Sequence, residues 1–459
     1  MDLFTPVVPP SAFHPNFERV LRVATAEERR VLTDWATGFS DRDGKFVKEF
    51  QTTFNSSFWE LYLFAAFKVL GLKVDLSPPS PDFFLHGSTG EFTAEAVTAS
   101  NPDGHRPEWD VDLSSGAVSE IDLPELLHLA SIRLANAIVT KHRKYQKTYA
   151  RLAHVRGKPF VLCVAPFEQP HFFAQNDNAI RRVLYGYDRP LTIDGRNAGN
   201  PIVVGEARAP SVEKESGASV PLGLFTKPGF EDISAVIFSS TATYGKLHAL
   251  RESNEVPVMF VAKRYQEISS VPAILTQWKT EYRETLLDGL HVCLNPYARH
   301  ELDLRLFEGR EIAVHRYFAG LDLYTADAPD GFLIERVCIS ARTGAGSKLP
   351  RTANRSAYKT SKRAPLPGGK LVEANAEIPP FVENHIAHYH GWTIVVAFDL
   401  VDRCWVSQAL QGTYFTIPEF MRGMGEDDDR LHLIGSVDSS TEEEARAHAV
   451  AAIDGQSVP

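Results

Sequence analysis

The chain has 459 residues, of which 44% are apolar, 10% aromatic and 23% charged, and its 48 basic and 58 acidic residues give a net charge of −10. This length and composition exclude a single-motif module and a wholly disordered chain, and predict two or three globular domains. The acidic balance argues against a protein that coats nucleic acid without specificity. Four cysteines without a CxxC pair argue against a disulfide framework or a thiolate zinc site.

The sequence contains no window of eighteen apolar residues, and its first residues lack a basic segment followed by an apolar run. We therefore expect neither a membrane span nor a secretory signal, and no membrane partner. The sparse cysteines suit a reducing compartment, which predicts a cytoplasmic protein. The sequence leaves the oligomeric state open, a homo-oligomer included.

The first elements are predicted to be helical. Residues 1–44 are expected to form an N-terminal helical arm, in which Thr25 to Glu28 have capping-box spacing before a helix that ends near Phe39. The next segment, from residue 55 to residue 70, is strongly apolar and is followed by Gly71, which predicts a buried helix.

Strands and a long helix follow this buried helix. Turn-forming residues separate three short runs that predict strands over residues 72–76, 82–86 and 91–99. Asp122 has the position of a capping residue for a helix that extends to about residue 153, and the apolar run 159–164 predicts a further strand.

The remaining residues predict more α/β structure and a separate C-terminal domain. Further strands are expected over residues 233–239, 256–262, 290–296 and 331–340, so that 171–340 forms either a continuation of the first domain or a second domain. Residues 341–370 carry eight basic residues and no acidic one, which is typical of a basic linker. Strands at 392–399 and 404–408 and a helix capped near Ser440 predict a small α+β domain over 371–459.

Acidic residues on neighbouring strands provide the strongest functional signal. Asp82 begins the second predicted strand and Glu95 lies on the third, so a hairpin brings the two carboxylates together. Two adjacent carboxylates are suited to Mg²⁺ or Mn²⁺, which bind oxygen ligands. Glu60 lies on the preceding helix, on one face with Leu63 and Phe67, and is a third candidate ligand. In the alternative interpretation, Asp82 caps a turn, Glu95 is exposed to solvent on an edge strand, and Glu60 lies at the margin of the apolar face of its helix.

This arrangement resembles the PD-(D/E)xK nuclease superfamily, which has the restriction-endonuclease-like fold. The resemblance covers about residues 45–170, a quarter of the chain, and rests on a helical Glu, a Pro-Asp and a Glu on successive elements. It implies a core of helix, three strands, helix and strand, and a Mg²⁺-dependent DNA endonuclease, with Asp82 and Glu95 as catalytic metal ligands and Glu60 as the extra acid. The motif Lys is absent, because Val97 has its position.

Lys141 is the predicted replacement for the missing Lys. Helical periodicity places it on the inward face of the long helix, with Leu134, Ile138 and Tyr145. A Lys that faces a sheet needs carboxylate partners, which Asp82 and Glu95 offer. The superfamily tolerates migration of its Lys to this helix. The alternatives are an ammonium turned to solvent along Tyr145, or Lys73 in its place.

The same helix carries basic residues that predict a nucleic-acid contact. Between residues 133 and 158 there are eight basic residues and no acidic one, with two tyrosines among them. The candidates are Arg133, Arg143, Lys144, Lys147 and Arg151. The alternative is a solvated helix face whose positive charges complement the negative, C-terminal end of the helix dipole.

Three hypotheses follow for the function. The first is a metal-dependent endonuclease that acts on DNA, which by resemblance indicates bacterial restriction or anti-phage defence. The second is a nuclease-like fold without activity, as Val97 permits, that serves as a nucleic-acid-binding or protein-interaction scaffold. The third is an interaction protein that binds its partner through residues 371–459, in which the acids are structural and nucleic acid is not bound. A cluster formed by His385, His388 and His390 lacks a completing ligand and is expected to have a surface or packing role.

Overall fold

The protein is described here by a computed structural model. The structure describes residues 1–23, 26–101, 104–110, 122–188, 191–193, 201–203, 207–254, 256–267, 272–307, 309–340, 372–373, 384–389, 392–399, 404–411, 432–439 and 441–456. The predicted linker 341–370 and the predicted cap at Thr25 lie outside these residues.

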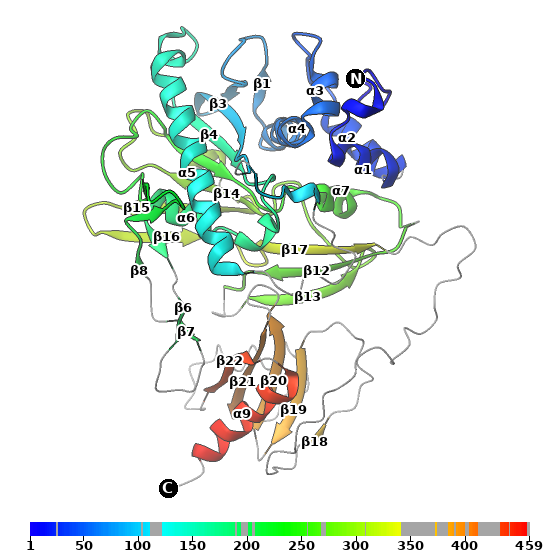
Figure 1. Cartoon of the computed structure of the whole chain (residues 1–459), viewed down its shortest axis with the longest axis vertical. Helices are drawn as coiled ribbons and strands as arrows, with labels where there is room; N and C mark the ends of the chain where they lie inside the picture. Colours follow the sequence, from blue (N-terminus) through cyan, green and yellow to red (C-terminus); the bar gives the residue numbers. More distant parts are fainter. Residues whose placement is uncertain are drawn as a thin grey trace.

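A mixed sheet of eight strands forms the centre of the larger part of the molecule, in the order β1-β2-β3-β4-β11-β14-β15-β16 (Figure 1). Its strands are β1 (Lys73–Asp75), β2 (Phe83–Gly87), β3 (Gly90–Thr98), β4 (Phe160–Ala165), β11 (Ala235–Phe238), β14 (Leu290–Leu294), β15 (Ile312–Phe318) and β16 (Leu323–Asp327). The first three strands are antiparallel, and β4 is parallel to β3. Residues 235–327 thus extend the sheet that residues 73–165 begin.

Helices from the first part of the chain cover one face of this sheet. They are α1 (Pro15–Val23), α2 (Ala26–Trp35), α3 (Phe46–Thr52) and α4 (Phe54–Val69), joined on this face by α7 (Tyr244–Leu250). The N-terminal residues pack into this layer, since Leu3 and Phe17 are buried in the same core as Phe83. The predicted helical arm is therefore attached to the sheet.

The opposite face is covered by α5 (Leu123–Lys147) and α6 (Asn178–Tyr185). Asp122 caps α5 as predicted, because its side chain accepts a hydrogen bond from the backbone N–H of Glu125 at 3.0 Å. The helix ends at Lys147, earlier than expected, and continues as a short 3-10 turn over Tyr149–Arg151. The predicted elements between residues 54 and 165 are otherwise confirmed to within a few residues.

Short pairs of strands and a second, three-stranded sheet lie outside the large sheet. The short pairs are β5 (Tyr187–Asp188) with β8 (Ala207–Arg208), β6 (Leu191–Ile193) with β7 (Pro201–Val203), and β9 (Ser211–Glu213) with β10 (Ser219–Pro221). The second sheet has the order β13-β12-β17, from β12 (Val258–Arg264), β13 (Ala273–Trp278) and β17 (Leu333–Ser340).

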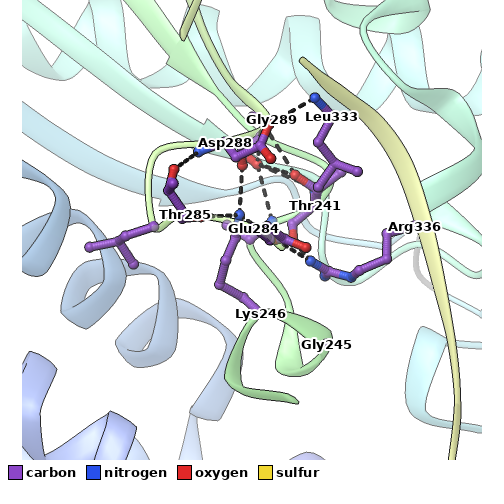
Figure 2. Close-up of polar contacts among 12 residues, drawn as sticks. Thr241, Gly245, Lys246, Glu284, Thr285, Asp288, Gly289, Leu333 and Arg336 are labelled. Atoms are coloured by element: carbon purple, nitrogen blue, oxygen red, sulfur yellow. Dashed lines mark hydrogen bonds and ion pairs between the residues drawn. The ribbon is translucent and has the colours of Figure 1, made fainter. Parts of the chain in front are cut away.

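A buried ionic network joins this second sheet to α7 (Figure 2). The Glu284 carboxylate lies 2.5 Å from both Lys246 Nζ and Arg336 Nη1, and Lys246 also donates to the carbonyl of Asp288 at 2.6 Å. Gly245 permits the close approach, because a Cβ there would lie 2.8 Å from the Arg336 guanidinium. All three charged side chains are almost inaccessible to solvent, so the network depends on complete pairing.

The C-terminal part is a separate sheet covered by one helix, in the lower part of Figure 1. Its strands are β18 (Val372–Glu373), β19 (Asn384–Tyr389), β20 (Trp392–Asp399), β21 (Cys404–Gln411) and β22 (His432–Ser439), and the helix is α9 (Glu442–Gln456). Thr441 caps α9 through its hydroxyl, which accepts from Glu444 N. Among the described residues, no helix is long and apolar enough to cross a membrane.

Candidate functional site

The predicted acids lie near enough to influence one another's charge, where β2 and β3 pass between α4 and α5. Phe83 pairs with Ala94 in the antiparallel register, so Asp82 lies opposite Glu95 one step along the ladder. The Asp82 carboxylate accepts a hydrogen bond from the backbone N–H of Ala96 at 2.8 Å. The hairpin therefore brings the Asp82 carboxylate to the part of β3 that carries Glu95, as the sequence predicts.

Glu95 is the most enclosed acid of this group, with a side chain that is 2% exposed. Its Oε1 atom accepts from Lys141 Nζ at 2.6 Å, from Tyr149 OH at 2.9 Å and from Lys144 Nζ at 3.1 Å. Its Oε2 atom is buried and has no hydrogen-bond partner among the described residues. A buried carboxylate oxygen without a partner is costly, so this atom is suited to a bound cation.

Lys141 reaches the acids from α5, as its position on the inward face predicts. Its ammonium contacts Glu95 and does not follow the alternative course to solvent along Tyr145. Val97 packs against the apolar core beneath α5, so the motif position carries no charge. The positive charge beside Glu95 comes instead from α5, through Lys141. Lys73 is exposed at the first position of the edge strand β1, so it is not brought to Glu95 in this way.

The electrostatics of Glu60 and Asp82 show that the acids share one environment. Burial and the nearby Asp82 charge raise the pKa of Glu60 from 4.5 to about 8. Burial and the Glu95 charge raise the pKa of Asp82 from 3.8 to about 6. Mutual repulsion of this kind is relieved by a cation, and perturbed acids of this kind concentrate at functional sites.

The donor set fits a hard divalent cation held mainly by two carboxylates. Asp82 and Glu95 would supply oxygen ligands, and Glu60 is the third acid of the group. Mg²⁺ characteristically completes such a ligand set with water. Within the part of the chain that the structure describes, the three acids do not each place an oxygen within 4.8 Å of the others. That spacing is met by a different group, Asp177, His291 and His315.

The five predicted nucleic-acid contacts divide into two kinds. The Arg133 guanidinium donates to the carbonyl groups of Ser100 and Asn101 at 2.5 and 3.1 Å, so it stabilises the loop after β3. Lys144 is half exposed and donates to Glu95. The other three side chains are exposed on α5 and the turn that follows it; they are Arg143, Lys147 and Arg151.

Sequence reasoning missed two features of this face of the sheet. Lys144 and Tyr149 are direct partners of Glu95, although the helical periodicity that selected Lys141 also places Tyr149 on the inward face. The group of Asp177, His291 and His315 has no motif spacing that would have identified it. Only the order of the strands brings its two histidines together.

Comparisons with known protein families, with curated proteins and with solved structures found no match to this chain.

Proposed function

We propose that the protein is a Mg²⁺- or Mn²⁺-dependent DNA endonuclease whose site consists of Glu60, Asp82, Glu95 and Lys141. The observation that carries this proposal is the contact between Lys141 and Glu95 at 2.6 Å, beside a second carboxylate on the neighbouring strand. Restriction or anti-phage defence is the biological role that we propose for such an enzyme.

The succession of elements around the acids supports a restriction-endonuclease-like core. The order is α4, β1, β2, β3, α5 and β4, with an antiparallel meander followed by a strand parallel to β3. In this arrangement Asp82 immediately precedes β2, Glu95 lies on β3, and α5 covers the face onto which Glu95 points. These are the positions that the resemblance to PD-(D/E)xK nucleases implies.

Lys141 supports an active enzyme, because it compensates for Val97 at the motif position. The resemblance requires an ammonium beside the acid of β3, and α5 provides one from a residue 46 positions later in the chain. An ammonium in this position stabilises negative charge that develops on a phosphodiester during attack. Tyr149 holds the same carboxylate oxygen, and burial raises its pKa, so the phenol remains a hydrogen-bond donor.

The residues of the site then have distinct roles. A divalent ion bound by Asp82 and Glu95 would supply Lewis acidity and lower the pKa of a water molecule. Lys141 would neutralise the scissile phosphate, and Glu60, the acid from α4, would add negative charge beside the ion. The exposed Arg143 and Lys147 would hold the phosphate backbone along α5.

A cleavage assay on linear, circular and single-stranded DNA with Mg²⁺ or Mn²⁺ tests the proposal. We expect metal-dependent cleavage by the wild type, and its loss in Asp82→Ala and in Lys141→Ala. Absence of cleavage by the wild type, together with salt-sensitive DNA binding that survives Asp82→Ala, would overturn it in favour of an inactive, DNA-binding fold. Cleavage that survives both substitutions would place the active site elsewhere.

A further inference from the structure

A second group of ligand atoms lies on the same face of the large sheet, away from the acids. Asp177 immediately precedes α6, His291 lies on β14 and His315 on β15. One ligand atom of each lies within 4.8 Å of the others. The histidines are 5% and 1% exposed, so an ion held here would be almost enclosed by protein.

The two sites are distinct, as the sheet register shows. Glu95 pairs with Leu162, Leu162 with Val236, Val236 with Cys293, and Cys293 with His315. Glu95 and His315 therefore belong to one row across the sheet, separated by four strand spacings, or about 19 Å. An ion at His315 is too far from Asp82 and Glu95 to take part in their chemistry.

The geometry of the two imidazoles suits adjacent positions around one ion. Nδ1 of His291 lies 2.9 Å from Nε2 of His315. Two nitrogens at this separation, each about 2.1 Å from a metal, subtend an angle of about 90° at the ion. This is the angle between neighbouring ligands in five- or six-coordinate sites, and two histidines with one carboxylate are a common set for first-row transition metals.

The surroundings orient His315 as metal-bound histidines are usually oriented. Its second ring nitrogen, Nδ1, lies 2.7 Å from the hydroxyl of Tyr324 on β16. Such an outer partner fixes the tautomer and the ring direction of a metal ligand. The ring of His291 is packed against Phe332 and Phe238, with centroids 5.1 and 6.0 Å away. Both imidazoles are thus held in place before any ion binds.

Asp177 provides the negative charge and the route to solvent. Its side chain is 22% exposed, and Arg181 of α6 lies 3.7 Å from its Oδ2 atom. The charge of Arg181 will lower the affinity for a metal without occupying either imidazole.

We propose that Asp177, His291 and His315 bind one first-row transition-metal ion, which stabilises the start of α6 against β14 and β15. Imidazole ligands favour Zn²⁺, Ni²⁺ or Co²⁺ over Mg²⁺, so this site and the carboxylate site select different ions. The proposal does not depend on the endonuclease function, because it concerns other residues and another metal.

Titration of the EDTA-treated full-length protein with Co²⁺, in excess Mg²⁺ to occupy the carboxylate site, tests this assignment. We expect one Co²⁺ per chain with a visible absorption band, displaced by Zn²⁺, and a raised melting temperature. Asp177→Asn and His315→Gln should each lose the band, whereas Tyr324→Phe should bind about ten- to a hundredfold more weakly. The conservative Tyr324→Phe keeps the test informative if the ligand variants fold poorly.

Two controls separate this site from other histidines. His142→Gln removes a histidine of similar burial that pairs with Asp232, and it should leave the band unchanged. Replacement of His385, His388 and His390 by Ala should likewise leave it unchanged. The proposal is overturned if the wild type binds no Co²⁺, Zn²⁺ or Ni²⁺, or if binding disappears only in the triple variant. In those cases the two imidazoles are simply hydrogen-bonded to each other.

Discussion

The ammonium of Lys141 lies 2.6 Å from the Glu95 carboxylate, although 46 residues separate the two in the chain. Lys141 comes from α5 and Glu95 from β3, and Val97, two residues beyond Glu95, packs into the core beneath the same helix. The packing of α5 on the sheet therefore supplies the positive charge beside the Glu95 carboxylate.

Lys141 and Lys144 contact the same carboxylate oxygen, which makes them a matched pair for substitution. Lys141→Met should lower the rate of DNA cleavage at least about a hundredfold, because it removes charge stabilisation at the reacting phosphate. Lys144→Met should lower it less than about tenfold, since the Lys144 side chain is 49% exposed and its charge is screened. Single-turnover rates at saturating DNA measure both effects, and circular dichroism confirms folding. A larger effect at Lys144 would contradict the assignment.

Glu60 should make the metal-free protein less stable as the pH rises. Its folded-state pKa of about 8 exceeds the unfolded value of 4.5, so the folded state binds the proton more tightly. The resulting stabilisation is complete below pH 4.5 and is lost as the pH rises towards 8. Glu60→Gln should match the wild type at pH 5 and exceed its free energy of unfolding by about 1 kcal/mol or more at pH 8.

Urea unfolding in EDTA at the two pH values measures this difference, with the exposed Glu213→Gln as control. Mg²⁺ should stabilise the wild type at pH 8 more than it stabilises Glu60→Gln, because the ion relieves repulsion among the acids. An identical pH profile for wild type and Glu60→Gln would show that Glu60 is not held in this environment.

The exposed cations of α5 and the turn after it should set the salt dependence of DNA binding. Substitution of Arg143, Lys147 and Arg151 by Gln should make the plot of log affinity against log salt concentration less steep. The slope should fall in magnitude by up to about 2.7, because each phosphate that is no longer neutralised removes about 0.9. Exposed cations on other elements serve as the control, namely Lys73, Lys227 and Arg310. Fluorescence anisotropy at several salt concentrations gives the slopes. Equal slopes for the two triple variants would assign DNA binding to another surface.

Glu284 should be essential for stability, because it neutralises two buried cations. Burial alone would raise its pKa, but the charges of Arg336 and Lys246 lower it from 4.5 to about 2. Glu284→Gln leaves those cations without compensation and should cost about 3–5 kcal/mol. The stabilisation is present above pH 4.5 and is lost as the pH falls towards 2, so the difference from wild type should shrink in acid.

Glu252→Gln is the matched control for Glu284→Gln. Glu252 pairs with Arg30 at 2.7 Å, but both side chains are exposed, at 79% and 49%. Its loss should change the thermal stability little, because solvent screens the pair. Thermal unfolding at pH 7 and pH 4 compares the two variants. Similar small losses for both would show that the buried network is not a stabilising unit.

Local patterns in the sequence were sufficient for the elements around the acids. The apolar run of residues 55–70 predicts α4, the turn residues define β1 to β3, and Asp122 marks the start of α5. Helical periodicity then places Lys141 on the inward face. These features are predictable because they depend on neighbours within a few residues along the chain.

Only the tertiary structure decided which distant side chains meet. The pairing of β14 with β15 brings His291 and His315 together, and the packing of β17 on α7 places Arg336 beside Lys246 and Glu284. No periodicity encodes these contacts, because they depend on the order of strands in a sheet and on the burial of charges that must then be paired. The sequence by itself determined the elements around the predicted acids, and the packing of those elements determined the partners of each buried charge.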